Sequence, residues 1–310
     1  MKKEVEKLLQ YVQKPARYIG GELNAVVKDK EKVDIRYAFC FPDTYEIGMS
    51  HLGMKILYGL VNDRDDSWCE RVFAPDNDME EQLRKNNVPL FALESGDYIK
   101  DFDMIGFTLQ YELSYTNILN MLNLAQIPLK SSDRESLTPL ICVGGPCACN
   151  PEPITDFVDI VFLGDGEETT NQIIDLLIKA KKNGLSKHEF LLKAKDITGI
   201  YVPSFYKDSY NDDGTLKSLE PLYDAPKKVK KAVVSDMNSV YYPKEFVVPY
   251  INIVHDRAVE EIFRGCIRGC RFCQAGFIYR PIREKSVETI NMQSKALIAV
   301  SYTHLTLPTT

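Results

Sequence analysis

The sequence predicts an α/β protein built on a doubly wound parallel sheet. Two observations carry this prediction: apolar runs of strand length alternate with segments of helical periodicity, and turns rich in small or acidic residues follow the runs. Parallel neighbours need a crossover connection, so this alternation is typical of a sheet whose two faces are covered by helices. Because 310 residues exceed the size at which one core usually keeps growing, we also expect more than one domain.

The first two hundred residues supply the expected elements in order. A short amphipathic helix at 2–14 comes first. Buried strands are expected at 33–41, 69–73, 104–109, 140–143 and 159–163. Helices are expected at 47–62, 79–86, 114–125 and 167–182. Five strands joined in this way suggest a flavodoxin-like sheet, in which ligands bind beyond the carboxyl ends of the strands, where the strand order reverses.

After residue 200 the pattern changes to short strands, tyrosines and prolines. A turn at 211–214 predicts a hairpin that leads into a linker. A strand at 258–263 and a helix at 286–299, with Ser286 as N-cap, then form one β/α unit. We therefore divide the chain into an N-terminal helix, a sheet domain, a hairpin with linker, the start of a second domain and a tail, at 1–18, 19–199, 200–250, 251–299 and 300–310.

The tail, VSYTHLTLPTT, resembles translated adaptor DNA from a sequencing library. It has no helical periodicity and follows a helical segment that stops abruptly. We expect this tail to be non-native and the natural protein to continue beyond Ala299. The alternative is a native terminus without regular structure.

The composition limits the kinds of partner that the protein is expected to bind. Lys and Arg number 38 against 44 acidic residues, so the net charge is −6 and no global basic excess indicates nucleic acid, although a local contact with RNA stays open. The basic run at 227–231 is interpreted as a solvated edge, with a nucleic-acid or partner contact as the alternative. The N-terminus lacks the apolar core of a signal peptide, and no apolar run approaches the roughly 18 residues of a membrane span. We expect a cytoplasmic protein without a membrane segment.

Three cysteines carry the clearest chemical signal. Cys266, Cys270 and Cys273 crowd into eight residues, and a glycine directly precedes each of the first two. Three thiolates in one tight loop can hold three corners of a [4Fe-4S] cluster and leave the fourth iron open for a small molecule. The alternative is a zinc site or a chance grouping of structural cysteines. Zinc prefers a fourth Cys or His at a matching distance, and the nearest candidate is His255.

The turn after the first expected strand resembles a cobalamin-binding motif. Asp43, Tyr45 and Gly48 follow the pattern Asp-x-His-x-x-Gly, with tyrosine in place of the cobalt-ligating histidine. Any cobalamin would therefore be bound without histidine ligation. His51 is interpreted as an ordinary helix residue.

The turns after the later strands resemble the other loops of cobalamin-binding domains. The candidate contacts there are Thr108, Gly144, Gly145, Gly164, Gly166 and Glu167. Glycine lets a backbone approach a flat corrin or its nucleotide tail, although glycine turns also end strands in any α/β domain. Cys147 and Cys149 have no third ligand in spacing, and we interpret them as buried thiols.

Residues 1–299 as a whole resemble the N-terminal part of an uncharacterised family of radical S-adenosylmethionine (SAM) proteins with a cobalamin-binding domain. The resemblance is carried by the cysteine motif, with Phe272 before its third cysteine, and by the stretches 41–58, 101–122, 143–168 and 261–288. It implies an enzyme that cleaves SAM reductively, with a [4Fe-4S] cluster, SAM and cobalamin as cofactors, and with Phe272 packed near the adenine. It also implies a truncated radical SAM barrel after residue 251, so this chain alone is expected to be inactive.

The resemblance leaves the reaction and its partners open. Transfer of a methyl or other group is the first hypothesis, with electrons from a reductant protein such as flavodoxin or ferredoxin. The substrate could be RNA, protein or a small metabolite. Two alternatives remain: a radical SAM enzyme whose Rossmann-like domain does not bind cobalamin, and a non-catalytic metal-binding module.

Overall fold

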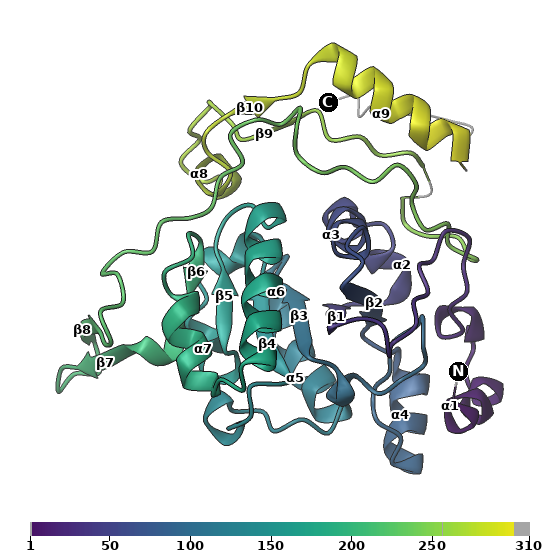
Figure 1. The fold of residues 1–310 in the computed structure, drawn as a ribbon, viewed down its shortest axis with the longest axis horizontal. Helices are drawn as coiled ribbons and strands as arrows, with labels where there is room; N and C mark the ends of the chain where they lie inside the picture. The colour runs from purple at the N-terminus through teal and green to yellow at the C-terminus, as the bar shows by residue number, and fades with distance from the viewer. Residues whose placement is uncertain (1, 256, 301–310) are drawn as a thin grey trace.

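A six-stranded sheet forms the centre of the protein (Figure 1). The computed structural model describes residues 2–255 and 257–300. The strands lie in the order β2-β1-β3-β4-β5-β6, and every neighbouring pair is parallel except β5 and β6. Their bounds are Ile35–Phe41, Ser67–Phe73, Met104–Thr108, Leu140–Gly144, Ile160–Phe162 and Ile200–Tyr201 for β1 to β6. The order 2-1-3-4-5 is that of flavodoxin-like sheets, which confirms the predicted doubly wound α/β fold.

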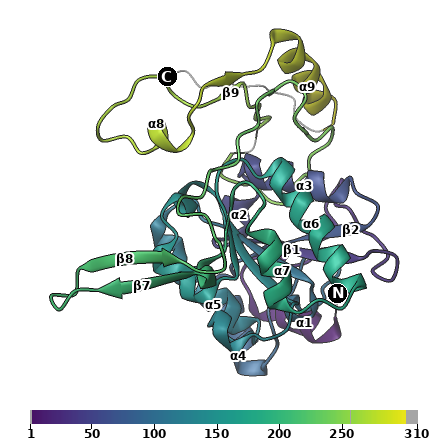
Figure 2. The same cartoon turned by 60° about the vertical axis from the view of Figure 1, so that its left-hand side comes forward.

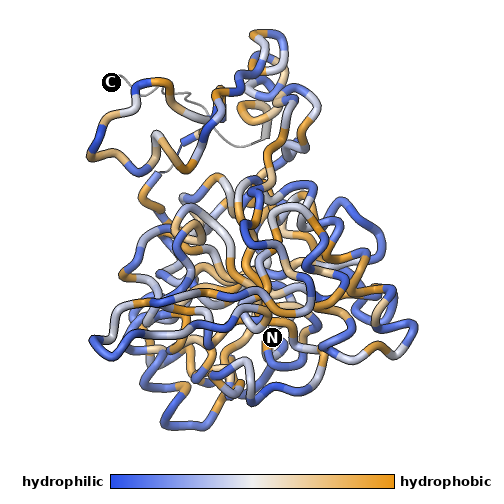
Figure 3. The backbone as a smooth tube through the Cα atoms, turned by 90° about the vertical axis from the view of Figure 1, so that its left-hand side faces the viewer, coloured by the Kyte–Doolittle hydropathy of each residue, from blue (hydrophilic) through white to orange (hydrophobic). Residues whose placement is uncertain are grey.

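Helices cover both faces of this sheet (Figure 1). Along β1, Ala38 and Cys40 belong to one buried cluster, whereas Tyr37 and Phe39 belong to the other, because successive side chains of a strand point to opposite faces. The first cluster includes residues of α1 (Lys3–Leu8), α4 (Asn77–Asn86) and α5 (Tyr115–Leu124). The second includes residues of α3 (Leu52–Asn62), α6 (Glu167–Lys182) and α7 (Lys187–Ala194). In the backbone tube of Figure 3, apolar positions gather in the interior of the protein, as expected for a sheet covered on both faces.

The predicted helix at 47–62 is divided into two helices. A short α2 (Tyr45–Gly48) ends before His51, and α3 begins at Leu52. His51 has extended backbone (φ −88°, ψ 115°) and caps α3, because its ring nitrogen Nδ1 accepts the backbone N–H of Met54 at 3.1 Å. The His51 cap therefore explains why the predicted helix is interrupted between Gly48 and Leu52.

Two further segments differ from the prediction. Helix α7 and strand β6 were not expected, and a two-residue strand is too short to carry a periodic signal. The expected strand at 258–263 is reduced to β9 (Phe263–Arg264), which pairs antiparallel with β10 (Arg283–Glu284). The acidic Glu261 turns instead toward Arg264, at 2.7 Å.

The C-terminal third lies against the carboxyl edge of the sheet. The predicted hairpin is present as β7 (Tyr206–Tyr210) and β8 (Leu216–Pro221), and it projects from the body of the protein (Figure 2). The following chain is tied to the sheet domain by β-bridges from Gly164 to Ala232 and from Leu23 to Val248. It then forms β9, β10, α8 (Ala275–Ile278) and α9 (Val287–Val300) above α3 and α6 (Figure 1).

Helix α9 confirms the predicted helix at 286–299 and its cap, since the N–H of Thr289 donates to Ser286 Oγ at 3.2 Å. Residues 301–310 of the expected non-native tail lie outside the described residues. Among the described residues, no helix is long and apolar enough to cross a membrane. The division into domains stays a prediction.

Candidate functional site

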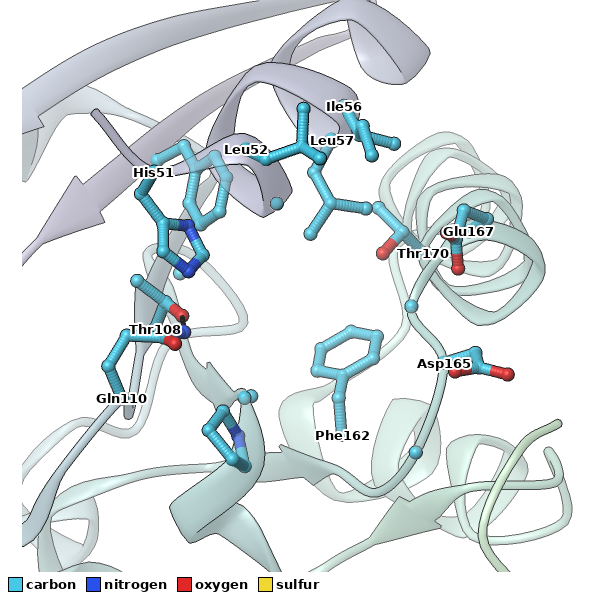
Figure 4. A pocket seen from close by; sticks show the side chains of 18 of the residues that line it. His51, Leu52, Ile56, Leu57, Thr108, Gln110, Phe162, Asp165, Glu167 and Thr170 are labelled. Atoms are coloured by element: carbon cyan, nitrogen blue, oxygen red, sulfur yellow. Dashed lines mark hydrogen bonds between the residues drawn. The ribbon is translucent and has the colours of Figure 1, made fainter. Parts of the chain in front are cut away.

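A cavity of about 440 Å³ opens at the carboxyl edge of the sheet, between α3 and α6. In Figure 4, His51, Leu52, Ile56 and Leu57 lie on one side of it, and Phe162, Asp165, Glu167 and Thr170 lie on the other. The C-terminal segment completes the lining with Glu261, Phe263, Arg264, Gly265 and Tyr279. This is the position in which doubly wound sheets bind ligands.

The predicted glycine loops line this cavity. Gly144, Gly145, Gly164 and Gly166 all contribute to its wall, together with Thr108 and Glu167. Gly145 has φ +101°, and a Cβ there would lie 2.8 Å from the carbonyl oxygen of Leu109. Gly164 has φ +97°, and its Cβ would lie 2.1 Å from the carbonyl oxygen of Ala232. Close approach of two protein backbones therefore requires glycine at both positions, whether or not a ligand is bound.

The turn after β1 faces away from this cavity. Tyr45 is buried in the core with its ring edge against Phe73, and its hydroxyl donates to Glu22 Oε1 at 2.8 Å. Burial and the neighbouring Glu22 carboxylate raise the pKa of Tyr45 well above its usual value. Asp43 accepts a hydrogen bond from the Tyr111 hydroxyl at 2.7 Å. The structure therefore places Asp43, Tyr45 and Gly48 outside the lining of the cavity that the other predicted residues share.

His51 lines the cavity instead, although the sequence predicted an ordinary helix residue there. Its Nδ1 is occupied by the Met54 N–H, and its other nitrogen faces Gln110, which in turn donates to Thr108 Oγ1 at 2.5 Å. Burial lowers the pKa of His51, so the ring is neutral near pH 7. Because Nδ1 accepts the Met54 N–H, the proton of the neutral ring lies on Nε2, whereas a metal-ligating histidine keeps one nitrogen unprotonated for the metal and donates from the other. In the sequence, the only signal that His51 would line the cavity is its position shortly after the first strand.

A partly buried charge cluster joins the cavity wall to the base of the cysteine loop. Arg264 lies 2.5 Å from Glu167, 2.7 Å from Glu261 and 3.2 Å from Asp165. Asp165 also pairs with Arg283 and accepts the N–H of Val234 at 2.8 Å. Glu261 is only three residues from Arg264, whereas Asp165 and Glu167 come from a segment about a hundred residues earlier, and no local pattern could have predicted those two contacts.

The three cysteines of the motif share one loop on the surface. Cys270 is exposed, and Cys266 and Cys273 are partly exposed. The Arg268 N–H points to Cys266 Sγ at 3.5 Å, and Gly269 has φ +64°, so the backbone already turns around the first sulfur. Within residues 2–255 and 257–300, no three His, Cys, Asp or Glu side chains are grouped closely enough to hold a metal ion. The donor set nevertheless suits a cluster, because three accessible thiols in eight residues are typical of iron-sulfur ligands.

The remaining predicted residues flank this loop. Phe272 is 92% exposed and lies outside the lining of the cavity. Cys147 is buried, as expected, but Cys149 is exposed. Partial removal from water by the surrounding protein raises the pKa of both thiols. Both therefore favour the protonated form and are weaker metal ligands than an ordinary cysteine.

A second cavity, of about 490 Å³, lies on the other face of α3. Two of its polar side chains are already paired within the protein. Arg71 pairs with Glu22 at 2.7 Å and with Glu94 at 2.6 Å, and the Tyr58 hydroxyl accepts the N–H of Val26 at 2.8 Å. The two cavities share no lining residue, but α3 contributes residues to each of them, so it separates the two.

Fold and site together define a doubly wound α/β domain whose ligand cavity adjoins a cysteine loop. Residues 53–203 match a family described as radical SAM proteins, N-terminal. This match confirms the resemblance to radical SAM proteins that the sequence predicted. It covers the sheet domain from α3 to the end of β6 and ends before the cysteine loop.

Individual relatives were found in both sequence and structure. An uncharacterized protein of Methanocaldococcus jannaschii, MJ0966, is 27% identical over 254 residues, which are 82% of this chain and 44% of that protein. The radical SAM methyltransferase TsrM of Kitasatospora setae, solved with cobalamin and a [4Fe-4S] cluster, is 11% identical with a TM-score of 0.46, over 85% of this chain and 46% of that chain. A second TsrM structure, with tryptophan and a SAM analogue, gives the same TM-score and covers 45% of that chain. The chain thus spans less than half the length of these relatives.

Proposed function

We propose that this chain is part of a radical SAM enzyme that cleaves SAM reductively and transfers a methyl or related group with the help of cobalamin. The observation that carries the proposal is the adjacency of a ligand cavity at the carboxyl edge of the sheet and a loop with three accessible thiols. The match to the N-terminal domain of radical SAM proteins supports the same class. The division of the chain after residues 18, 199, 250 and 299 is part of this proposal.

Cys266, Cys270 and Cys273 would hold the [4Fe-4S] cluster. When bound, such a cluster supplies the electron that splits the SAM sulfonium into methionine and a 5′-deoxyadenosyl radical. The chain contributes position: Gly265 and Gly269 shape the loop at φ +98° and +64°, and the Arg268 N–H lies against Cys266 Sγ. Phe272, exposed beside the third thiol, is available to cover the adenine of SAM. The electron that reduces the cluster would come from a reductant protein such as flavodoxin or ferredoxin.

The cavity fits part of a cobalamin. A volume of about 440 Å³ encloses a drug-sized molecule, and a corrin with its nucleotide tail is larger than that. We infer that the tail would enter between α3 and α6, past Phe162 and Thr170, and that the corrin would sit at the mouth under the cysteine loop. His51 is the histidine in the cavity lining, and because its Nδ1 accepts the Met54 N–H, the proton of its neutral ring lies on Nε2. The ring would therefore offer cobalt no free nitrogen, and Tyr45 lies in the core.

Anaerobic reconstitution with iron and sulfide tests the proposal. We expect about four irons per chain, as a cubane cluster requires, and reductive cleavage of SAM by the full-length enzyme. Changing Cys270 to alanine should abolish both, whereas the matched change Cys149→Ala, at another exposed thiol, should preserve the iron content. Stoichiometric zinc without iron would instead support a non-catalytic metal-binding module.

A second candidate follows from the size of the cavity. A volume of about 440 Å³ is also sufficient for a small substrate, and then the sheet domain would be a substrate-binding module without cobalamin. Titration with hydroxocobalamin separates the two. Saturable binding to the chain supports the first candidate, and its absence in a protein that takes up iron supports the second.

A further inference from the structure

Two arginines face each other at the base of the cysteine loop. Arg264 of β9 and Arg283 of β10 are directly paired in the antiparallel register, and like charges in that position destabilise a strand pair. Asp165 offsets this repulsion, because each of its carboxylate oxygens pairs with one of the two arginines. The side chains of all three are at most 13% exposed, so water does little to screen them.

The partner of these arginines is the same turn that lines the cavity. Gly164, Asp165, Gly166 and Glu167 form part of the cavity wall, and Glu167 receives both terminal nitrogens of Arg264, at 2.5 and 3.3 Å. Glu167 is also the first residue of α6, where a carboxylate interacts favourably with the helix dipole. One short turn therefore borders the ligand on one side and holds the cysteine loop on the other.

The connection from Arg264 to the first cysteine is short and rigid. Only Gly265 separates Arg264 from Cys266, and a Cβ at Gly265 would lie 2.6 Å from the carbonyl oxygen of Pro281. The ribbon of β9 and β10 has two residues in each strand, which is too short to be stable without support. The ion pairs to the turn after β5 are therefore among the contacts that hold it in place, together with the hydrogen bonds from Arg283 to the Val234 carbonyl and from Lys231 to the Ile278 carbonyl.

We propose that Asp165, Glu167 and Arg264 couple the cavity to the cysteine loop, so that a ligand in the cavity and a cluster on the loop strengthen each other's binding. A ligand that orders the turn after β5 fixes Arg264, and with it Cys266. Arg264 is in this sense a positioning residue. The inference rests on the proposed function, because the two ligands are the cobalamin and the cluster named there.

The test compares the affinity of the full chain for hydroxocobalamin before and after anaerobic reconstitution with iron and sulfide. Coupling between sites is reciprocal and typically amounts to about 5- to 150-fold, so we expect cluster-loaded protein to bind at least about 5-fold more tightly. Arg264→Gln should remove this difference. Arg264→Lys should retain part of it, because lysine keeps the charge but loses the fork that holds two carboxylates at once. The matched control is Arg271→Gln, at an exposed arginine of the same loop, and it should retain the full difference.

The following results would overturn the coupling or the proposed function. Equal affinity with and without the cluster, or an unchanged difference in folded Arg264→Gln protein, overturns the coupling alone. If circular dichroism shows that Arg264→Gln is unfolded, Arg264→Lys decides, and a full difference in that variant overturns the coupling. Protein that takes up neither iron nor hydroxocobalamin overturns the proposed function as well.

Discussion

Replacing Gly164 by alanine should destabilise the protein because of its neighbour across the turn. An L-residue at positive φ costs about 1–2 kcal/mol, and restriction of the unfolded chain returns about 0.4–1 kcal/mol of that. The new Cβ would lie 2.1 Å from the Ala232 oxygen, far inside the roughly 3.5 Å of a normal contact. Moving Ala232 away would break its two hydrogen bonds, with the Asp165 N–H at 3.0 Å and the Leu163 carbonyl at 2.8 Å. At about 1 kcal/mol each, these bring the expected loss to about 3 kcal/mol.

Gly184→Ala provides the matched control for this change. Gly184 also has a positive φ, +65°, but a Cβ there meets nothing within 4 Å, so the expected loss is about 1 kcal/mol or less. Guanidinium denaturation followed by the fluorescence of Trp68, the one tryptophan of the chain and buried in β2, measures both. A Gly164→Ala protein that loses no more stability than Gly184→Ala would refute the assignment of this glycine to backbone packing.

Two further predictions concern the buried cluster around Glu22. Tyr45→Phe removes the hydrogen bond to the Glu22 carboxylate and should lower the free energy of unfolding by about 1.5–3 kcal/mol. The affinity for hydroxocobalamin should not change, and a fall in affinity would place Tyr45 at the ligand. Burial disfavours the Glu22 carboxylate, but the nearby Arg71 outweighs it and holds the pKa of Glu22 below the ordinary 4.5. Because the folded pKa is below the unfolded one, this pairing stabilises the fold above about pH 4.5, and the contribution is lost as the pH falls through the folded value. The free energy of unfolding should therefore fall less on acidification in Glu22→Gln than in the wild type, and equal slopes would contradict the pairing.

Much of the sheet domain was predictable because its local signals agree with one another. The apolar runs give β1 to β5 within a few residues, and helix α6 has the predicted bounds 167–182. Helix α7 was missed although its capping box was present in the sequence, with Ser186 and Glu189 three residues apart. Strand β6 could not be predicted, since two residues joining the edge of a sheet leave no pattern.

The site was only partly predictable, because a motif gives residue types but not the direction in which they point. The glycine loops after β4 and β5 line the cavity as the motif suggested. Tyr45 occupies the motif position of a ligand, yet Glu22, 23 residues earlier, holds its hydroxyl in the core. His51 faces the cavity because it begins a helix where the periodicity predicted an unbroken one. Both differences arise from contacts that are remote in sequence or from a single cap.

The spacing of the cysteines predicts what the loop can bind, whereas its place in the molecule depends on the turn after β5. Gly164 brings that turn against Ala232 of the linker, Asp165 separates two arginines that would otherwise repel, and Glu167 begins the helix that borders the cavity. A change at any of the three alters both the wall of the cavity and the support of the loop. The turn after β5 therefore links the wall of the cavity to the position of the three thiols.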